Sequence, residues 1–422
     1  MLTLSDILLP NNQSRWGKYL LYVVLIGFIV RLGISISVTY CTDIGYWIRV
    51  SSNLTAGYGL YDVPGYYYMP IWGYVIAVLT YICNALNIKY GYLDSDLLIP
   101  EVVTGAGQIT PTIEYALIFK LFLIIVDFLV AIYIYRIIKD IFKNEKAALM
   151  GFARWFLSPL SISISAFRVN FDNLEILFML ISVYYAYSGN YIVSGSSMAL
   201  SLLTKPYGVF LAIALMVYSY YKNRDVRDFV KYLSSMLITA LIFMLPVLLN
   251  GDFIASMDWL FGRLQNFDKD VYNVIIPFAP ILVVIFFYVV SKKLKYAANK
   301  EKSVLSIGLI FTSLILIIPG NIQYFLVVLA LMIVISSEDY RFTYICMFIL
   351  GIASFVIGNV SIFGEIAYHD AAIPPLRDIT IAGYTIFGII RAGYPFLLSA
   401  CGIVCLITGI CMFRRYSHET KV

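Results

Sequence analysis

The chain has 422 residues, of which 61% are hydrophobic and only 13% are charged, about half the charged share of an ordinary soluble domain. This composition excludes a water-soluble globule and indicates an all-α polytopic membrane protein. The net charge of +5 gives no reason to expect nucleic acid as a partner, because the basic residues stand in short clusters and form no stripe.

Apolar runs close to the length of a membrane crossing recur along the whole chain. A bilayer is crossed by roughly 20 apolar residues, and this length predicts about twelve transmembrane helices in a single domain over residues 1–422. Several are shorter than a full crossing, which favours a cavity that reaches into the bilayer. The expected helices lie near 19–38, 116–138, 148–167, 173–187, 191–204, 207–221, 231–249, 274–291, 303–318, 323–337, 341–361 and 392–413.

Basic and acidic residues divide between alternate connections of this threading. The basic clusters include Arg15/Lys18, Lys139/Lys143/Lys146 and Arg414/Arg415, and most acids, from Asp43 onward, fall in the other connections. By the positive-inside rule, the basic connections and both chain ends face the cytoplasm. The acidic connections would then lie on the external or lumenal face.

The first external connection, residues 39–115, is long and rich in tyrosine and tryptophan, including Trp47 and Trp72. Such rings are expected in the headgroup layer of the membrane. Within this loop the run 70–88 is apolar, but a crossing there would place the basic cluster around Lys139 on the wrong side. We therefore expect a re-entrant or interfacial helix at 70–88.

Asp43 follows the first expected helix in the sequence Thr42-Asp43-Ile44-Gly45-Tyr46. A carboxylate at the mouth of a helix bundle is costly to desolvate and usually has a function. It is either a solvated acid at a helix end or a general base toward a hydroxyl. Asp62 is a second acidic candidate in the same loop, although a Tyr-Asp pair is also typical of a turn.

A dense polar cluster, with Arg168, Asn170 and Asp172, separates two expected helices on the same external side. It fits a capped turn in which Asp172 is the helix N-cap and Glu175 completes a capping box. Contact with a substrate is compatible with that role.

Lys205 interrupts the apolar stretch 191–221. Its side chain either extends outward to the membrane surface or points into a cavity, where an ammonium could bind a lipid-linked phosphate. Lys120 and Asp127 lie two turns apart on one expected helix, where they could act as separate polar anchors of the bundle.

A further polar break contains Gln323 and Tyr324, and Arg391 stands within another apolar stretch. Arg391 either binds phosphate in a bidentate manner or extends to the membrane surface.

Nucleotide-binding and zinc-protease motifs are absent from the sequence. It has no Walker A loop, no strand-anchored Gly-x-Gly-x-x-Gly and no HExxH pattern, and with only two histidines it cannot form a multi-histidine metal centre. A group transferred by this chain must therefore come from a donor in the membrane. No cofactor is certain, and a divalent metal stays possible.

Taken in order, short motifs over residues 42–326 resemble the C-type glycosyltransferase superfamily (GT-C). The nearest likenesses are GPI mannosyltransferase I and bacterial polyprenol-phosphate-mannose-dependent mannosyltransferases. The motifs are Thr42-Asp43-Ile44-Gly45-Tyr46, Gly59-Leu60-Tyr61, Tyr68-Met69-Pro70, the helix from Lys120 to Asp127, Ser158-Pro159, Asn170/Asp172, Lys205-Pro206-Tyr207 and Gln323-Tyr324-Phe325-Leu326.

The resemblance implies a GT-C helix bundle with a long external first loop and an integral membrane glycosyltransferase. Such an enzyme would move a sugar, with mannose the first candidate, from a polyprenyl-phosphate donor to a glycolipid or glycan acceptor, with inversion. Asp43 would match the catalytic acid of the first loop and act as the general base. The residues expected to contact substrates are Asp62, Lys120, Arg168, Asn170, Asp172, Lys205, Gln323, Tyr324 and Arg391.

One position departs from the GPI mannosyltransferase I pattern, because Gly45 stands where that family has a second acid. The departure puts a two-carboxylate metal site and the specific acceptor in doubt. A lipid or polysaccharide transporter is the alternative function, since it also needs a polar cavity within the membrane. A transporter, however, distributes polar groups along a path to both faces, whereas these groups concentrate on the external side.

Overall fold

The computed structural model describes residues 15–39, 41–62, 66, 68–93, 109–249, 269–317, 322–336 and 399–416. The all-α membrane class is confirmed, with one small two-stranded sheet in addition. The α-helices are α2 (Arg15–Ser37), α3 (Cys41–Thr55), α4 (Pro70–Ala85), α5 (Ile113–Arg136), α6 (Glu145–Phe156), α7 (Pro159–Ile162), α8 (Asp172–Tyr187), α9 (Tyr191–Leu202), α10 (Val209–Asn223), α11 (Val226–Leu249), α13 (Lys269–Lys295), α14 (Lys300–Ile317) and α15 (Phe325–Ile335).

Several short elements connect or extend these helices. A C-terminal helix covers Ser399–Tyr416. The 3₁₀-helices are η1 (Leu60–Asp62), η5 (Pro206–Gly208) and η6 (Ile322–Tyr324), and the π-helices are η3 (Ile137–Ile141) and η4 (Ser163–Arg168). Strands β1 (Gly91–Leu93) and β2 (Ile109–Pro111) pair antiparallel, with Gly91 opposite Pro111.

Fewer helices than the twelve expected are both long enough and apolar enough to cross a membrane. Within the described residues four are long and apolar enough, namely Lys18–Ser37, Ile113–Ile141, Val226–Leu249 and Ser399–Tyr416. A fifth arises if α6 and the bent segment Pro159–Arg168, at 43° to each other, form one span. Most other expected spans are helices that do not meet this test, and the one at 341–361 lies outside the described residues. The apolar run 70–88 contains the 16-residue α4, and its interfacial placement stays a prediction.

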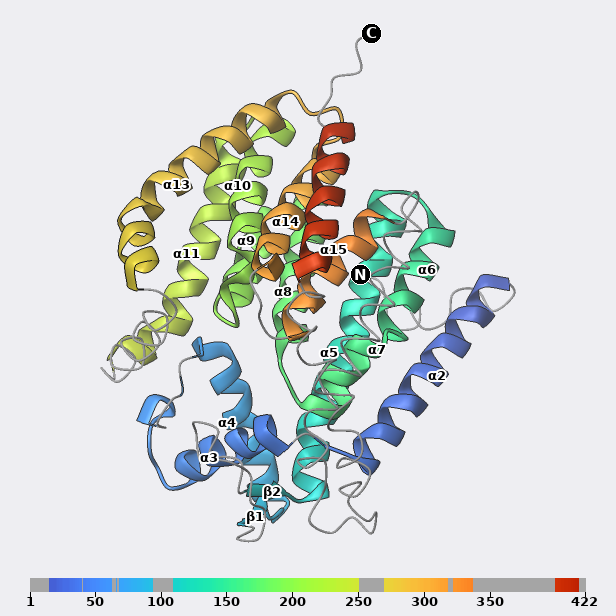
Figure 1. Cartoon of the computed structure of the whole chain (residues 1–422), viewed down its shortest axis with the longest axis vertical. Coiled ribbons are helices and arrows are strands. Elements are labelled where there is room, and N and C mark those ends of the chain that lie inside the picture. Colours follow the sequence, from blue (N-terminus) through green and yellow to red (C-terminus); the bar gives the residue numbers. More distant parts are fainter. Residues whose placement is uncertain are drawn as a thin grey trace.

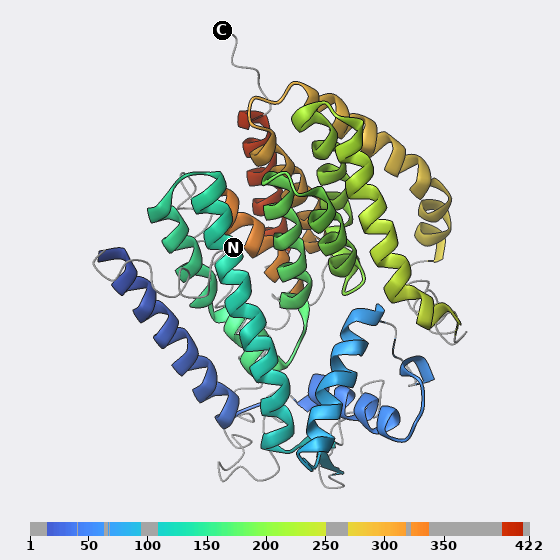
Figure 2. The same ribbon diagram turned by 180° about the vertical axis from the view of Figure 1, so that it is seen from behind.

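The helices form a bundle with a small unit at one end. Figures 1 and 2 show α5, α8 to α11 and α13 to α15 packed side by side, with α2 against α5, α6 and η4. We call α3, α4 and the β1–β2 hairpin the small unit; it lies at the lower end of the bundle in both views. The breaks between α2 and α3 and between η4 and α8 lie toward this same end.

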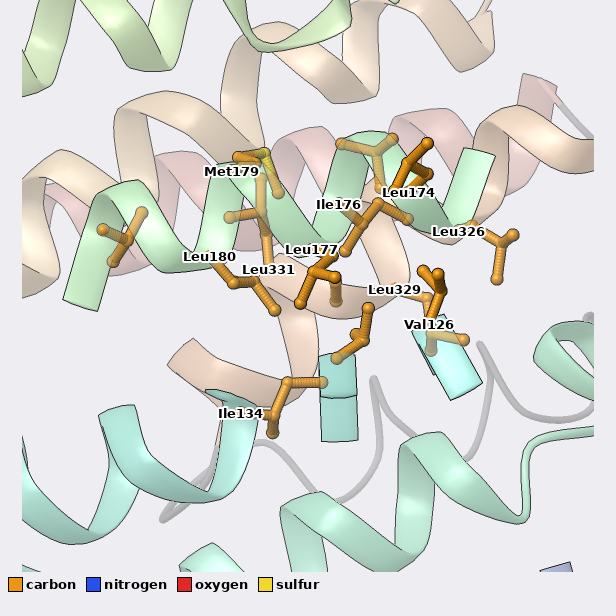
Figure 3. Packing of buried hydrophobic residues seen from close by; sticks show 14 of the residues in the cluster. Val126, Ile134, Leu174, Ile176, Leu177, Met179, Leu180, Leu326, Leu329 and Leu331 are labelled. Carbon is orange, nitrogen blue, oxygen red and sulfur yellow. The ribbon is translucent and has the colours of Figure 1, made fainter. Parts of the chain in front are cut away.

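The apolar core lies where α5, α8 and α15 meet (Figure 3). Every residue of α15 from Phe325 to Ile335 is buried, as expected for a helix that is apolar on all sides. Leu329 and Leu331 of α15 belong to the same core cluster as Leu177 of α8 and Ile134 of α5. The most hydrophobic described helix is therefore enclosed by protein.

Two buried cations attach α2 to α5. The Lys120 ammonium donates to the carbonyl of Ser35, in the last turn of α2, at 3.2 Å, and to that of Val38, just after the helix, at 2.7 Å. A cation at this end of a helix satisfies carbonyls that have no partner within the helix. Asp127 instead pairs with Arg31, so the expectation of two separate polar anchors is confirmed.

The sequence analysis did not single out Arg31, although a charged residue inside an apolar run was a visible signal. Its guanidinium lies 3.0 Å from the Asp127 carboxylate, donates to Ser161 Oγ at 2.9 Å, and stands 4.2 Å from the Phe156 ring centroid. Both partners of the ion pair are fully buried. This network joins α2, α5 and the bent α6–α7 segment.

Replacing Arg31 by methionine should strongly destabilise the protein, because it leaves the buried Asp127 carboxylate without its counter-ion. The cost expected for breaking such a pair is about 3–5 kcal/mol. The double variant Arg31→Met/Asp127→Leu should recover much of the loss, because no unpaired charge then stays buried. Thermal inactivation in detergent, followed by size-exclusion chromatography, measures both. Equal losses in the single and double variants would contradict this account.

Candidate functional site

Asp43 lies in the first turn of α3, just after the short connection that follows α2. Its side chain is partly buried, and its Oδ2 accepts a hydrogen bond of 3.5 Å from Asn170 Nδ2. Asp43 and Asn170 are 127 positions apart in the sequence. The fold therefore brings the predicted base to the predicted polar cluster.

That cluster forms a tight turn between the π-helix η4 and helix α8. Val169 adopts the left-handed conformation, with φ 56° and ψ 45°, and the Asn170 backbone N–H donates back to Ile164 O at 3.1 Å. The Val169 carbonyl accepts a hydrogen bond of 3.0 Å from the Trp47 indole of α3. The turn thus presents Arg168, Asn170 and Asp172 within a few residues of one another.

Lys205 lies in the break between α9 and α10, with extended backbone. Its side chain is only 5% exposed, which excludes extension to the membrane surface. The ammonium lies 2.7 Å from Asp172 Oδ2 and 3.4 Å from Asn170 Oδ1, and 4.3 Å from the centroid of the Phe171 ring. The Lys205 side chain at this break therefore points into the protein, where its ammonium contacts the polar turn.

The predicted capping box at the start of α8 is wrong. Phe171 occupies the N-cap position and makes no side-chain cap, while Asp172 lies inside the helix and its carboxylate binds Lys205. The Asp172 carboxylate thus neutralises an ammonium from another part of the chain instead of capping its own helix. The side chain of the fully buried Glu175 makes no bond to the start of α8 within the described residues, and its carboxylate faces the backbone of Tyr207 and Gly208 instead.

An aromatic cluster connects the small unit to this turn. The Trp72 and Phe171 rings are stacked, with centroids 4.7 Å apart and planes at 8°. Trp47 contacts both of them and Tyr68 edge-on or tilted, at 5.5–5.8 Å. Because Trp47 and Trp72 are fully buried, the expectation that these two rings lie in the headgroup layer is wrong: they pack against the polar turn.

The environment of Asp43 favours its protonated form more than water does. Burial raises the pKa of its carboxyl above the ordinary value, because the charged form is poorly solvated there. The charges of Arg168 and Lys205 and the hydrogen bond from Asn170 oppose this rise without cancelling it. The charge of Asp172 adds to it. A carboxylate whose pKa is raised is a better proton acceptor than an ordinary aspartate.

Two of the other predicted site residues are engaged elsewhere. Asp62 is exposed, and its carboxylate accepts from the Gly59 backbone N–H at 2.6 Å, which is the turn-forming alternative. Lys120 binds the carbonyls at the end of α2, as described above. Neither arrangement shows a contact with the cluster around Lys205.

The remaining predicted residues differ in their position. Gln323 and Tyr324 belong to η6 and are partly buried, and the Tyr324 ring packs against Tyr207 with centroids 5.1 Å apart. Tyr207 is two residues after Lys205, so η6 lies next to the break between α9 and α10. Arg391 lies outside the described residues.

The described side chains near Asp43 do not form a cluster of metal ligands. Among the described residues no group of three or more His, Cys, Asp or Glu side chains is arranged to hold a metal ion. Around Asp43 lie the Asn170 amide, the Arg168 guanidinium, the Lys205 ammonium and a second carboxylate, Asp172. Because the Asp172 carboxylate is already paired with Lys205, this set fits an anionic or hydroxyl-bearing ligand better than a metal.

The site contains residues that the sequence analysis missed as functional. Trp47 donates to the backbone of the polar turn, and Val169, within the turn, accepts that bond in the left-handed conformation. A signal for Trp47 was available, because it follows Asp43 by four positions and so lies on the same face of a helix. No sequence pattern indicated the conformation of Val169, since a β-branched residue rarely adopts it.

Residues 116–249 match the family model of dolichyl-phosphate-mannose-protein mannosyltransferases. The matched segment contains the turn with Asn170 and Asp172 and the break at Lys205, and it is less than half of the chain. No curated protein matches the chain. Over this segment the chain is similar to a family of mannosyltransferases, and the apolar helices of the bundle are those of an integral membrane protein.

Proposed function

We propose that the protein transfers a sugar from a polyprenyl-phosphate donor to a lipid- or protein-linked acceptor, with Asp43 as the general base. The observation that carries the proposal is the meeting of three chain segments: Asp43 on α3, the Asn170–Asp172 turn, and Lys205. The family match to mannosyltransferases supports mannose as the transferred sugar.

The reaction is a single displacement at the anomeric carbon of the donor. The acceptor oxygen forms a bond to this carbon while the bond from the carbon to the phosphate oxygen breaks, which inverts the configuration. The acceptor proton passes to the Asp43 carboxylate. The electron pair of the broken bond stays on the lipid phosphate, whose added charge a nearby cation stabilises.

Lys205 is the group that we assign to the departing phosphate. An ammonium carries three N–H donors, and the described contacts of Lys205 account for two of them, to Asp172 and Asn170. A third donor is thus left for a phosphate oxygen, without loss of the ion pair. Tyr324, which packs on Tyr207, is a second candidate contact for the donor.

The proposed site lies on the external or lumenal face, with both chain ends in the cytoplasm. The distribution of basic clusters supports this orientation, and the small unit that carries Asp43 stands at one end of the bundle. The partners would be the donor lipid, a glycolipid or glycan acceptor, and the surrounding membrane. A transporter would need the same helices but no proton acceptor, so the loss of a single carboxylate separates the two functions.

The variant Asp43→Asn should lose sugar transfer by roughly 10²-fold or more, the range expected when a general base is removed. Asparagine keeps the size of the side chain and its ability to accept from Asn170. The assay is the transfer of labelled sugar from a panel of polyprenyl phosphates in proteoliposomes, beside wild-type protein. Asp62→Asn, at the exposed turn, is the matched control and should stay active. Undiminished transfer by Asp43→Asn would refute the assignment.

The pH dependence of transfer should show the raised pKa of Asp43. Activity requires the deprotonated carboxylate, so it rises with pH through a value above the ordinary aspartate pKa of about 3.9. Arg168→Gln removes a charge that lowers this pKa, and so should move the acidic limb of kcat/KM to higher pH. Lys146→Gln, an exposed cation at the start of α6, should leave the limb in place. A limb unmoved by Arg168→Gln would contradict this electrostatic coupling.

Lys205→Met should weaken the binding of a polyprenyl phosphate roughly tenfold or more, because a charge-assisted hydrogen bond is lost. The single variant also leaves Asp172 buried without its counter-ion, which destabilises the fold. Lys205→Met/Asp172→Asn avoids that problem and should bind as weakly as the single variant. Binding is measured by titration of the purified protein with farnesyl phosphate. Wild-type affinity in the double variant would exclude Lys205 as the phosphate contact.

A further inference from the structure

The turn before Asn170 has a backbone conformation that its residue does not favour. At the end of a helix the left-handed position is ordinarily taken by glycine, and a β-branched residue there crowds its Cβ against the following carbonyl. Val169 occupies this position with φ 56° and is fully buried. The surroundings must therefore hold the turn in place.

The indole of Trp47 is in position to do so. Its Nε1–H donates to the Val169 carbonyl at 3.0 Å, across an aromatic cluster that contains Phe171 and Trp72. Trp47 follows Asp43 by four residues on α3, so one helix face carries both the proposed base and this donor. The bond thus joins the small unit directly to the strained peptide.

The peptide that Trp47 contacts determines where the Asn170 side chain points. The Asn170 amide bridges the two charged groups of the site: its Nδ2 donates to Asp43 Oδ2 at 3.5 Å, and its Oδ1 accepts from Lys205 Nζ at 3.4 Å. Both bonds are long, so a small rotation of the turn breaks them.

We propose that Trp47 is a positioning residue, whose indole N–H holds the left-handed Val169 turn and thereby keeps the Asn170 amide between Asp43 and Lys205. The consequence for catalysis rests on the function proposed above, whereas the contact between Trp47 and the turn does not. Trp47 would act on the reaction only through Asn170.

A matched pair of variants isolates the indole hydrogen bond from ring packing. Trp47→Phe and Trp72→Phe both shorten a fully buried indole in the same cluster. Trp72 Nε1, however, has no hydrogen-bond partner in the described part of the chain. Trp47→Phe should therefore lower kcat/KM about tenfold further than Trp72→Phe, as displacement of a positioned group does. Equal losses in the two variants would overturn the proposal.

The pH profile separates positioning from general loss of packing. The charged and polar groups that face Asp43 are Arg168, Asn170, Asp172 and Lys205. If Trp47 acts through Asn170, Trp47→Phe moves the acidic limb to higher pH, because the amide no longer favours the carboxylate. In the Asn170→Ala background the same substitution should cause no further movement. An additional movement there would overturn the proposed route.

A measurement that needs no activity tests the contact itself. Glycine adopts the left-handed conformation without strain, so Val169→Gly should reduce the loss of thermal stability that Trp47→Phe causes, and should not reduce the loss caused by Trp72→Phe. Additive losses for Trp47→Phe and Val169→Gly would refute the contact. The two experiments can also disagree. If the stability losses of Trp47→Phe and Val169→Gly are coupled but Asp43→Asn stays active, the proposed base is refuted and the positioning role of Trp47 is not.

Discussion

The ion pair between Lys205 and Asp172 is the interaction on which the rest of the site depends. Its atoms lie 2.7 Å apart and are almost completely buried. Desolvating two charges generally costs more than their attraction returns, so such a pair contributes little to stability compared with apolar packing. Its effect is on geometry: it ties the break between α9 and α10 to the turn before α8. Asn170 and Phe171, both in that turn, complete the surroundings of the ammonium.

The small unit is held against the bundle, next to this ion pair, by hydrogen bonds as well as by packing. Its helix α4 begins against the end of α9, where the Ile71 N–H donates to Leu203 O at 3.2 Å. Further along α4, the Tyr74 hydroxyl donates to Phe243 O of α11 at 2.8 Å. With the Trp47 contact to the turn, the unit is attached to three separate parts of the bundle. Asp43 therefore has a defined position, although it lies at the start of a short helix.

The sequence predicted the class of the fold and the main polar residues, but not the way they pair. Apolar runs locate helices reliably, and Asp43, Asp172 and Lys205 were visible as charges at helix breaks. Their partners depend on which breaks meet in space, which one sequence does not contain. The capping box at Asp172 failed for this reason, since a local rule cannot anticipate a buried ammonium from another helix.

The number of membrane-spanning helices and the buried charges of the bundle could not be predicted for other reasons. Length alone could not separate helices that cross a membrane from shorter ones packed inside the protein, such as α15. Arg31 was missed because its partner, Asp127, lies on another helix 96 positions along the chain, and a single sequence does not show that pairing. Lys120 was predicted both as a polar anchor of the bundle and as a substrate contact, and its bonds to carbonyls at the end of α2 support the first of these roles.

The β1–β2 pairing holds the end of α4 close to the start of α5. Gly91 is opposite Pro111 and Leu93 opposite Ile109, so the chain after α4 and the chain before α5 run antiparallel, side by side. Thr112, next to β2, caps α5 through its side chain, and β2 also packs against α3, the helix that carries Asp43. A change in the pairing register of these two short strands would therefore shift α3 relative to α5, and with it the carboxylate at the start of α3.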